Sequence, residues 1–586
     1  MPDSLSRPIK IETLKTWLAT CDAQHAEHCR AGQITDDNQL PTWLVDVSRQ
    51  CIVHAQADLK YIALSYVWGR AASVSLTRST LDKLMNEGSL DEEVLPRTIR
   101  DAMNLATALD IGYLWVDRLC IVQDDDAEKH AQIKAMGSIY ARSHFTLIAA
   151  QSHDASGPLT SRPLRLSPPP SWASGLITPV VRTIAVWFSR GWTFQEFLFS
   201  RRKVVFHNNT VNWECHCSSA HENQELRSLT LSPCLRQTTQ TSSLGVDIDP
   251  WPNFHRYARL AALFTPRFLT YPEDVLDAFA GASAAFAQIY PGGMVTGMPA
   301  MVFDAALIWQ PYHPLERRKP NVLPDREAIL PSWSWVSWRG ELHSEAWQSG
   351  YNYLRRQPNH DPEGSGDGII KQHWTTISTV KWSHSSTLTS ERHPIPVLAD
   401  EWRKKYTHPS SPPPPTDWQR HNGQITKAAS FFTHPSVPGH EFWYPIPIGV
   451  NNHGRASRSR YLHTTTRHAH AEPFPKTSRS FGSGCAVLAL KAPDGRQAGC
   501  LRLNDMEQNT RGNTVAEKCH LIELSAGEVA LDEYVEDLRD HPLADYEFYN
   551  VMWVEWKGGV AYRRAVGRVE KAFWEAAAVE INLLLG

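Results

Sequence analysis

The sequence predicts an α/β protein in which a parallel sheet with helices on both faces is followed by a helical unit and a mainly β C-terminal unit. Between residues 58 and 217, apolar segments of strand length alternate with amphipathic segments of helical spacing, which is typical of repeated strand–helix–strand units. Helical patterns dominate from residue 251 to 345, and strand-like segments alternate from 481 to 586. These three observations define the predicted fold class.

Chain length and charge restrict the protein class. With 586 residues the chain is too long for one hydrophobic core, and we expect about two to four packing units. The formal net charge is −3, from 59 basic and 62 acidic residues, so no overall field favours nucleic acid. The N-terminus lacks the apolar core of a signal peptide, and no run of about 18 apolar residues occurs. We expect a soluble cytoplasmic protein with no nucleic-acid partner and no membrane span.

The first segments lead into the predicted sheet. Residues 1–57 are expected to hold an N-terminal helix, over 10–30, and an extended lead-in over 41–56. The run "YIALSYVWG" (61–69) is mostly apolar, has the length of a strand and ends in Gly69, as a buried strand does where it meets a loop.

A helix and a second strand follow. Residues 95–112 carry Pro96 near the start, Gly112 just past the end and apolar residues at helical spacing between them, which predicts an amphipathic helix. "YLWVDRLCI" (113–121) returns to strand composition, with Asp117 inside it. The acidic run "DDD" comes just beyond, and its simplest interpretation is a solvated surface.

The rest of this domain, which we place at 58–217, continues the alternation. A helix is predicted over 128–141 and a third strand over 144–150. Consecutive prolines make 167–175 a loop, because they remove main-chain donors. The helix that contains Glu196 comes next, and residues 202–215 are predicted to form a hairpin that turns at Asn208-Asn209.

Three further segments complete the predicted organisation. Residues 218–345 form the helical extension, which closes on the Trp-rich "LPSWSWVSWRG". Residues 346–480 are rich in Pro, Ser and His and predict a partly disordered linker, with apolar islands at 375–383 and 441–450. Residues 481–586 form the mainly β unit, with a late helix over roughly 566–578.

Polar and aromatic residues follow the predicted strands where a ligand is expected. In parallel sheets, ligands bind beyond the carboxyl ends of the strands. This rule selects candidates that could stack a flat ring and hold hydroxyl groups. They are Ser65, Tyr66, Trp68 and Gly69 after the first strand, Asp117, Gln123 and Asp124 around the second, Ser152 and His153 after the third, and the turn from Trp192 to Glu196.

Structural interpretations compete with each of these candidates. Trp68 and Trp192 are large aromatic residues of the kind that fill cores. Asp117 has the position of a strand-end carboxylate satisfied by main-chain donors. Thr193 followed three residues later by Glu196 has the spacing of a capping box, in which both side chains accept hydrogen bonds at a helix start. The sequence leaves both sets of interpretations open.

The ten cysteines lack the dense, even spacing of a small secreted scaffold and predict reduced thiols. Two clusters have metal-ligand residue types. Cys21, His25 and Cys29 lie four residues apart, which places them on one helical face, and a second trio follows the predicted hairpin, at Cys215, Cys217 and His221. Structural zinc requires four ligands and each trio offers three, so buried thiols are the favoured interpretation and no metal site is predicted.

Established catalytic signatures are missing. The sequence contains no Walker phosphate loop, no GxGxxG after a strand, no HExxH and no GxSxG elbow. These absences disfavour ordinary NTPases, dehydrogenases, zinc proteases and α/β-hydrolases. No cofactor is predicted.

Three blocks together resemble a known family. "YIALSYVWG", "LPRTIRDAMNLATALDIGYLWVDRLCIVQDD" and "SRGWTFQEFLFSRRKVVF" look like successive blocks of the fungal heterokaryon incompatibility (HET) domain. The resemblance covers about 60–217, and the later "RFLTYPEDVLDAFAG", "LPSWSWVSWRG" and "VEWKGGVAYRRAVGRV" resemble segments that flank it in HET proteins. HET domains are implicated in non-self recognition and programmed cell death after hyphal fusion, and their fold is similar to the Toll/interleukin-receptor (TIR) fold.

The resemblance also implies a chemistry. TIR domains that cleave NAD carry an essential glutamate in a helix, with the pattern Ser, one residue, Trp, Cys, two residues, Glu. "SRGWTFQE" is similar: Trp192 and Glu196 keep the spacing, Ser189 lies one residue further away, and Thr193 stands in place of Cys. The resemblance therefore implies Glu196 as the catalytic residue, with NAD as substrate rather than cofactor. The residues already selected at the strand ends, Ser65, Tyr66, Trp68, Gly69, Asp117 and Trp192, are then the expected binding residues.

Two functional hypotheses stay open. In the first, an intracellular HET protein triggers incompatibility-type cell death and cleaves NAD at the nicotinamide–ribose bond. In the second, the α/β domain is a non-catalytic interaction module that signals by self-association or by binding a protein partner. A shared fold does not imply a shared activity, so the sequence alone does not choose between them.

Overall fold

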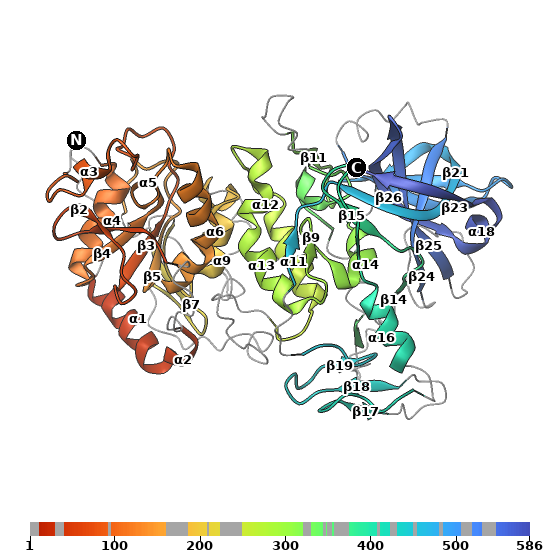
Figure 1. Cartoon of the computed structure of the whole chain (residues 1–586), viewed down its shortest axis with the longest axis horizontal. Coiled ribbons are helices and arrows are strands. Elements are labelled where there is room, and N and C mark those ends of the chain that lie inside the picture. The colour runs from red at the N-terminus through yellow and green to blue at the C-terminus, as the bar shows by residue number, and fades with distance from the viewer. Residues whose placement is uncertain are drawn as a thin grey trace, which may run out of the picture. The chain divides into compact units, whose positions relative to one another are not determined.

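The computed structural model describes most of the chain, and the described residues fall into two compact units (Figure 1). Unit 1 comprises Met1–Ile248 with Asp277–Ala285, and unit 2 comprises Asp249–Leu276 with Phe286–Gly586. The described ranges are 11–29, 40–91, 95–159, 186–207, 210–222, 249–319, 330–343, 347, 354–356, 374–406, 411–421, 430–448, 454–479, 484–505, 518–529 and 546–586. Among them, no helix has the length and apolar character needed to cross a membrane.

One mixed sheet is the centre of unit 1. In the described chain its eight strands run in the order β2-β1-β4-β3-β5-β6-β7-β8. The central four, β4, β3, β5 and β6, are parallel to one another, whereas β1, β2, β7 and β8 pair antiparallel. The strands are β1 (Trp43–Asp46), β2 (Cys51–His54), β3 (Tyr61–Ser65), β4 (Tyr113–Val116), β5 (Phe145–Ala149), β6 (Arg202–His207), β7 (Thr210–Cys215) and β8 (Ser219–His221).

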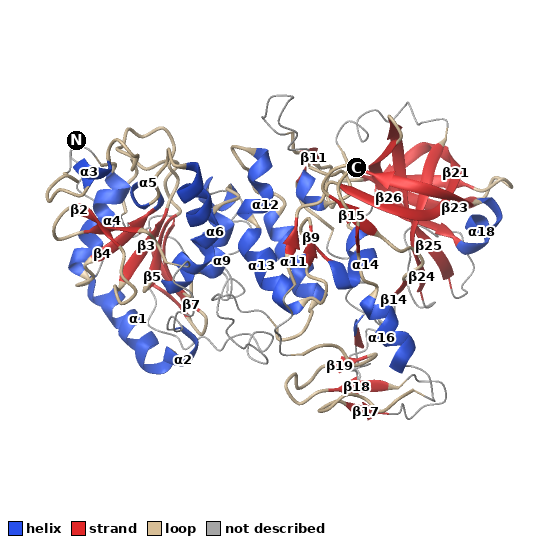
Figure 2. Cartoon of the chain, in the orientation of Figure 1, coloured by secondary structure: helices blue, strands red, loops and turns tan. Residues whose placement is uncertain are grey.

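Helices alternate with these strands, as Figure 2 shows in blue and red. They are α1 (Ile11–Gln24), α2 (Ala26–Cys29), α3 (Leu81–Leu84), α4 (Arg97–Ala108), α5 (Asp117–Cys120), α6 (Asp126–Arg142), α8 (Val186–Ser189) and α9 (Thr193–Phe199). Unit 1 also takes residues 277–285 from α12 (Val275–Ala278) and α13 (Ala280–Ile289). There Gln195 Nε2 donates to the carbonyl of Asp277, and its Oε1 accepts from Gly281 N.

The handedness of the connections places these helices on two faces of the sheet. The chain steps from β3 to β4 in one direction and from β4 back across β3 to β5 in the other. Right-handed crossovers then place α4 and α6 on opposite faces, as Figure 1 shows. The step from β5 to β6 continues in the second direction, which brings α9 to the α6 face, where the two helices pack together. The connections diverge between β3 and β5, and this is the topological switch point.

The predicted α/β alternation is confirmed, with corrections. The sheet is parallel only at its centre: the lead-in over 41–56 forms the antiparallel pair β1 and β2 at one edge. The predicted strand over 113–121 ends at Val116, and a short helix begins at Asp117, whose carboxylate accepts from Arg118 N at 2.7 Å. The predicted loop over 167–175 and the hairpin turn at Asn208-Asn209 lie outside the described residues.

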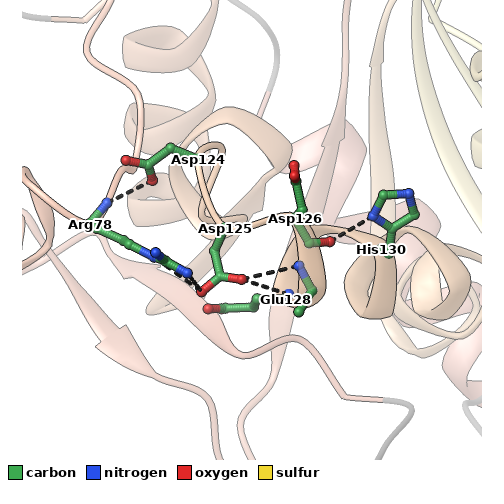
Figure 3. Close-up of polar contacts among 7 residues, drawn as sticks. Arg78, Asp124, Asp125, Asp126, Glu128 and His130 are labelled. Atoms are coloured by element: carbon green, nitrogen blue, oxygen red, sulfur yellow. Dashed lines mark hydrogen bonds and ion pairs between the residues drawn. The ribbon is translucent and has the colours of Figure 1, made fainter. Parts of the chain in front are cut away.

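The acidic run does more than face solvent (Figure 3). Asp125 precedes α6 and accepts from the main-chain N–H groups of Ala127 and Glu128, both at 3.1 Å, which makes it the helix N-cap. The same carboxylate accepts from Arg78 Nη2 at 2.7 Å, and Asp124 accepts from the main-chain N–H of Arg78 at 2.8 Å. The interpretation of this run as simply solvated is therefore wrong for Asp125.

Unit 2 begins with helices and continues into short strands. The helices are α11 (Phe254–Phe264), the remaining residues of α12 and α13, α14 (Phe303–Leu307), α16 (Leu398–Tyr406) and α18 (Lys571–Ala577). The short strands are β9 (Met294–Val295), β10 (Met298–Pro299), β11 (Glu316–Arg317), β12 (Trp338–Arg339), β13 (Arg355–Arg356), β14 (Trp374–Ile377), β15 (Ser383–Ser385), β16 (His393–Pro394), β17 (Gln419–His421), β18 (Phe431–Thr433), β19 (Glu441–Phe442) and β20 (Ala456–Ser457).

The predicted mainly β C-terminal region is confirmed. Six antiparallel strands of the described chain close into a ring, because β24 pairs with both β25 and β21. The ring follows the order β21 (Tyr461–Arg479), β22 (Ala486–Lys491), β23 (Gln497–Leu503), β26 (Val560–Glu570), β25 (Tyr546–Lys557) and β24 (Cys519–Val529), and β27 (Val579–Leu585) pairs with β21 and β26. Its core is apolar and includes Leu488, Leu501, Leu521 and Trp574.

One ring strand lies where the composition predicted a linker. Residues 461–479 form β21, although their sequence is rich in Thr, His and Arg. The buried positions of this strand are filled largely by small or polar side chains, among them Thr466, Ala469 and Ala471. A strand with such residues has a low apolar content, so composition alone does not predict it.

The loop after β3 contains a glycine that the fold requires. Gly69 has a φ of +60°, and a Cβ there would lie 2.1 Å from the Cβ of Asp154 in the loop after β5. Gly88 has a similar φ of +78° with no heavy atom within 4 Å of such a Cβ. An alanine at either position would therefore have a strained backbone, but only the alanine at Gly69 would also clash with Asp154.

Gly69→Ala is expected to lower the urea or thermal midpoint of unit 1 more than Gly88→Ala does. Both variants carry the cost of a left-handed alanine, roughly 1–2 kcal/mol, and overpacking at Gly69 adds about 1–3 kcal/mol. Unfolding of the full chain, followed by tryptophan fluorescence, measures the difference. Equal midpoints for the two variants would contradict the close approach of the two loops.

Candidate functional site

A buried carboxylate lies at the carboxyl end of the central strand β3. Glu196, on α9, is 6% exposed, and its carboxylate accepts a hydrogen bond from the hydroxyl of Ser65, the last residue of β3. Ser65 is fully buried and its Oγ also accepts from the indole Nε1 of Trp187, at 2.8 Å. α8 and α9 therefore meet β3 next to the switch point.

The direction of each proton in this group follows from the donor types. An indole N–H can only donate, so the Ser65 oxygen accepts from Trp187 and its own proton is directed to Glu196. The main-chain carbonyl of Glu196 accepts from Ser200, whose hydroxyl also contacts Thr146 Oγ1 at 2.6 Å. Both the side chain and the main chain of Glu196 are thus held by buried hydroxyl groups.

The predicted capping box is not formed. Trp192 is the residue before α9, with helical backbone angles and no side-chain cap. Thr193 Oγ1 donates to the carbonyls of Trp187 and Arg190, at 2.7 and 2.9 Å, so its hydroxyl proton points backwards along the chain. Because Glu196 is turned to Ser65 rather than to the helix start, helix capping does not explain this residue.

A second carboxylate lies beyond the neighbouring strand β4. Asp117 accepts from Trp68 Nε1 at 2.6 Å and from Arg118 N at 2.7 Å. The guanidinium of Arg118 lies over the Trp68 ring, 4.4 Å from its centroid. One face of this indole is therefore already occupied, and only the opposite face could stack on a ligand ring.

The two carboxylates influence each other's charge. Burial raises the pKa of Glu196 from 4.5 to about 7, the Ser65 hydrogen bond opposes that rise, and the negative charge of Asp117 adds to it. Burial likewise raises the pKa of Asp117 from 3.8 to about 6, against the hydrogen bonds from Trp68 and the main-chain N–H of Arg118. Arg190 lowers both pKa values through its charge. Paired buried carboxyl groups with raised pKa values are typical of functional sites.

Tyr66 brings a polar group to the same end of the sheet. Its side chain is 5% exposed, and its hydroxyl forms no hydrogen bond of good geometry within the described residues. Burial raises its pKa well above 10, and the charge of Asp117 raises it further. Because buried hydroxyl groups are normally paired, this one is a candidate to contact a ligand.

The remaining candidates are less closely joined. Gly69 shapes the loop after β3, and Trp192 is half-buried at the start of α9. Gln123 Nε2 donates to the carbonyl of Asp117 at 3.2 Å, behind the carboxylate. Asp124 is exposed and accepts a hydrogen bond from the main-chain N–H of Arg78 (Figure 3). Ser152 and His153 lie in the loop after β5, where His153 is exposed.

Sequence reasoning did not select Trp187, Tyr140 or Arg190, which all act on Glu196. Tyr140, on α6, lowers the pKa of Glu196 through its hydroxyl. Trp187 and Tyr140 lie in helices and Arg190 lies between α8 and α9, so no rule about strand ends selects them. Of the three, only Arg190 lies in the resembling block, which begins at Ser189.

Comparison with known proteins supports the predicted resemblance. Residues 61–196 match the family described as heterokaryon incompatibility protein (HET). A segment of 98 residues is 32% identical to heterokaryon incompatibility protein 6, OR allele, of Neurospora crassa. This alignment covers 15% of the chain and only 14% of that relative. No solved structure matches the chain. The chain therefore contains a HET domain, and the matched residues run from β3 to Glu196.

Glu196→Gln is expected to change how the stability of unit 1 depends on pH. Folding raises the pKa of Glu196 from 4.5 to about 7. The protonated carboxyl group therefore stabilises the folded state fully below pH 4.5, and this stabilisation is lost as the pH rises through about 7. A glutamine resembles the protonated form. The variant should match the parent near pH 4.5 and exceed its stability near pH 8, by about 3 kcal/mol as an order of magnitude.

Urea unfolding at both pH values measures this change, and Glu12→Gln, at an exposed position of α1, is the control. A stability difference between parent and Glu196→Gln that is the same at both pH values would contradict the raised pKa.

Proposed function

We propose that this chain is a cytoplasmic incompatibility-type signalling protein whose HET domain has a TIR-like fold and cleaves NAD at the nicotinamide–ribose bond, with Glu196 as the catalytic carboxylate. The observation that carries this proposal is the placement of Glu196. Its carboxylate is buried at the carboxyl end of a central parallel strand and is held by Ser65 rather than used to cap its own helix.

The chemistry suits two buried carboxyl groups. Cleavage of the nicotinamide–ribose bond passes through an oxocarbenium-like state, in which positive charge develops on the ribose. A pre-positioned carboxylate stabilises that charge strongly where water is excluded. Nicotinamide is a good leaving group, so the reaction does not require an acid partner. Glu196 is the stabilising group in this proposal, and Asp117 adds negative charge that favours the cationic nicotinamide ring.

The neighbouring groups have roles that fit the same substrate. The unpaired hydroxyl of Tyr66 can hydrogen-bond to a ribose hydroxyl or to the carboxamide. Trp68 offers one ring face, because Arg118 covers the other. Arg190 carries a positive charge close enough to lower the pKa of both carboxyl groups, and it is our candidate to face the pyrophosphate.

The burial of Glu196 has a consequence for access. A substrate reaches this carboxylate only after the loops at the strand ends or the start of α9 have moved. We infer that self-association opens the site, so turnover should rise more steeply than protein concentration. The name of the Neurospora crassa relative supports the incompatibility role.

NAD consumption by the purified full chain tests the proposal. At high protein concentration the parent should release nicotinamide, and Glu196→Gln should reduce the rate at least about a hundredfold, as loss of a key electrostatic group does. The parent rate should rise with pH through about 7, because the ionised carboxylate is the active form. Glu12→Gln should keep the parent rate.

Two outcomes would contradict this assignment. Equal turnover by the parent and Glu196→Gln would remove Glu196 from catalysis. No turnover by an assembled parent, shown by light scattering to associate, would leave the alternative function, a non-catalytic module that signals by self-association. The stability of Glu196→Gln at pH 8 shows whether a lost rate comes from unfolding.

A further inference from the structure

The two cysteine clusters that the sequence places about 190 residues apart come together in unit 1. Cys21 lies on α1, Cys29 is the last residue of α2, and Cys215 is the last residue of β7. The ligand atoms of Cys21, His25 and Cys215 all lie within 4.8 Å of one another, and His25 Nδ1 is 3.6 Å from the Cys215 sulfur. Cys29 lies one helical turn after His25, and its sulfur is 4.0 Å from that of Cys217, two residues after Cys215.

Local structure explains why these side chains converge. The main-chain N–H of His25 donates to the carbonyl of Cys21, and that of Cys29 to the carbonyl of His25, both at 2.9 Å. This i, i+4 spacing places three potential ligand residues on one helical face. On the other side, Cys215 N donates to the carbonyl of Ser218 at 2.8 Å, which closes a tight turn between β7 and β8.

We propose that Cys21, His25, Cys29 and Cys215 bind one structural zinc ion. Three sulfurs and one imidazole nitrogen form the donor set that zinc takes in closed tetrahedral sites. Neither cluster supplies four ligands alone, but the helical trio and Cys215 together do. Three of these ligand atoms, from Cys21, His25 and Cys215, already converge; the Cys29 side chain, on the same helical face, turns toward them to complete the set, and His221 on β8 is left out. Cys217, whose sulfur is 4.0 Å from that of Cys29, borders the site without completing it.

The surroundings suit a metal complex with a net negative charge. Three thiolates and a neutral imidazole leave a charge of −1 around a divalent zinc. Two nearly buried arginines lie beside this cluster: Arg202 pairs with Cys215 across strands β6 and β7, and Arg201 directly precedes Arg202. Arg202 is also fixed by Asp22, at 2.7 Å. Such outer groups hold the charge of a metal site and orient its ligands.

The proposed ion has a structural role. It would tie α1 and α2 to the hairpin at the edge of the sheet, two parts of the chain that are far apart in sequence. A cross-link across a long loop stabilises the folded state by restricting the unfolded chain. All four coordination positions are taken by side chains, so the site has no position for substrate, and the proposal is independent of NAD cleavage.

Metal content of the full chain, purified under reducing conditions, is the first test. Mass spectrometry of the elements should find about one zinc per chain. Cys21→Ser and Cys215→Ser should each lower that content at least tenfold, whereas Cys51→Ser, at a buried thiol of β2 outside the cluster, should leave it unchanged. Removal of zinc by a chelator should lower the unfolding midpoint of the parent.

A second measurement tests the site even if the ligand variants do not fold. Cobalt(II) added to the chelator-treated full chain should produce the sulfur-to-metal charge-transfer band and the strong visible bands of a tetrahedral site. Cys215→His keeps four ligands and should retain the visible bands, while the charge-transfer band falls by about one third because two thiolates remain.

Three results would overturn the site. The first is a full chain that holds no zinc even after incubation with zinc and reductant. The second is a loss of zinc in Cys51→Ser equal to the loss in Cys215→Ser. The third is a disulfide between Cys29 and Cys217, detected by thiol alkylation before reduction, because it would remove one of the four ligands.

Discussion

The hydrogen bond between Ser65 and Glu196 joins the sheet of unit 1 to the helices that cover it. A carboxylate can be buried at 6% exposure only if donors surround it. Ser65 supplies one donor, Trp187 fixes the serine proton by donating to its oxygen, and Tyr140 faces the same carboxylate from α6. The position of α9 therefore depends on residues from β3, α6 and α8, and a change in any of them would alter the charge of Glu196.

The same burial changes the affinity of Glu196 for its proton. Burial raises the pKa of Glu196 to about 7, and the charge of Asp117 contributes to that rise. Two carboxyl groups that disfavour each other's charge favour a cation between or beside them. Ionisation of these groups lowers the stability of unit 1. A positively charged ligand beside them would offset that loss.

Two buried charged groups of unit 2 are held by partners within the protein. In unit 2, the Arg563 guanidinium lies against the Trp309 ring and donates to the carbonyls of Leu307 and Trp309. Glu523 accepts from Arg467 and from Trp574, both at 2.6 Å. At the carboxyl ends of β3 and β4, two buried carboxyl groups act on each other's charge, and burial raises both of their pKa values. This pair of carboxyl groups is why the end of β3, rather than the polar core of unit 2, is the candidate site.

The sequence by itself determined the α/β alternation, most element positions and the residues at the strand ends, because hydrophobic periodicity and Pro or Gly boundaries are local properties. It also pointed to Glu196 through the spacing from Trp192. Composition misplaced 461–479, since a strand can bury small and polar side chains. Only the tertiary structure decided that Glu196 turns to Ser65 rather than to its own helix start, and that Cys215 joins Cys21 and His25. Both depend on contacts between residues more than a hundred positions apart, which no local pattern encodes.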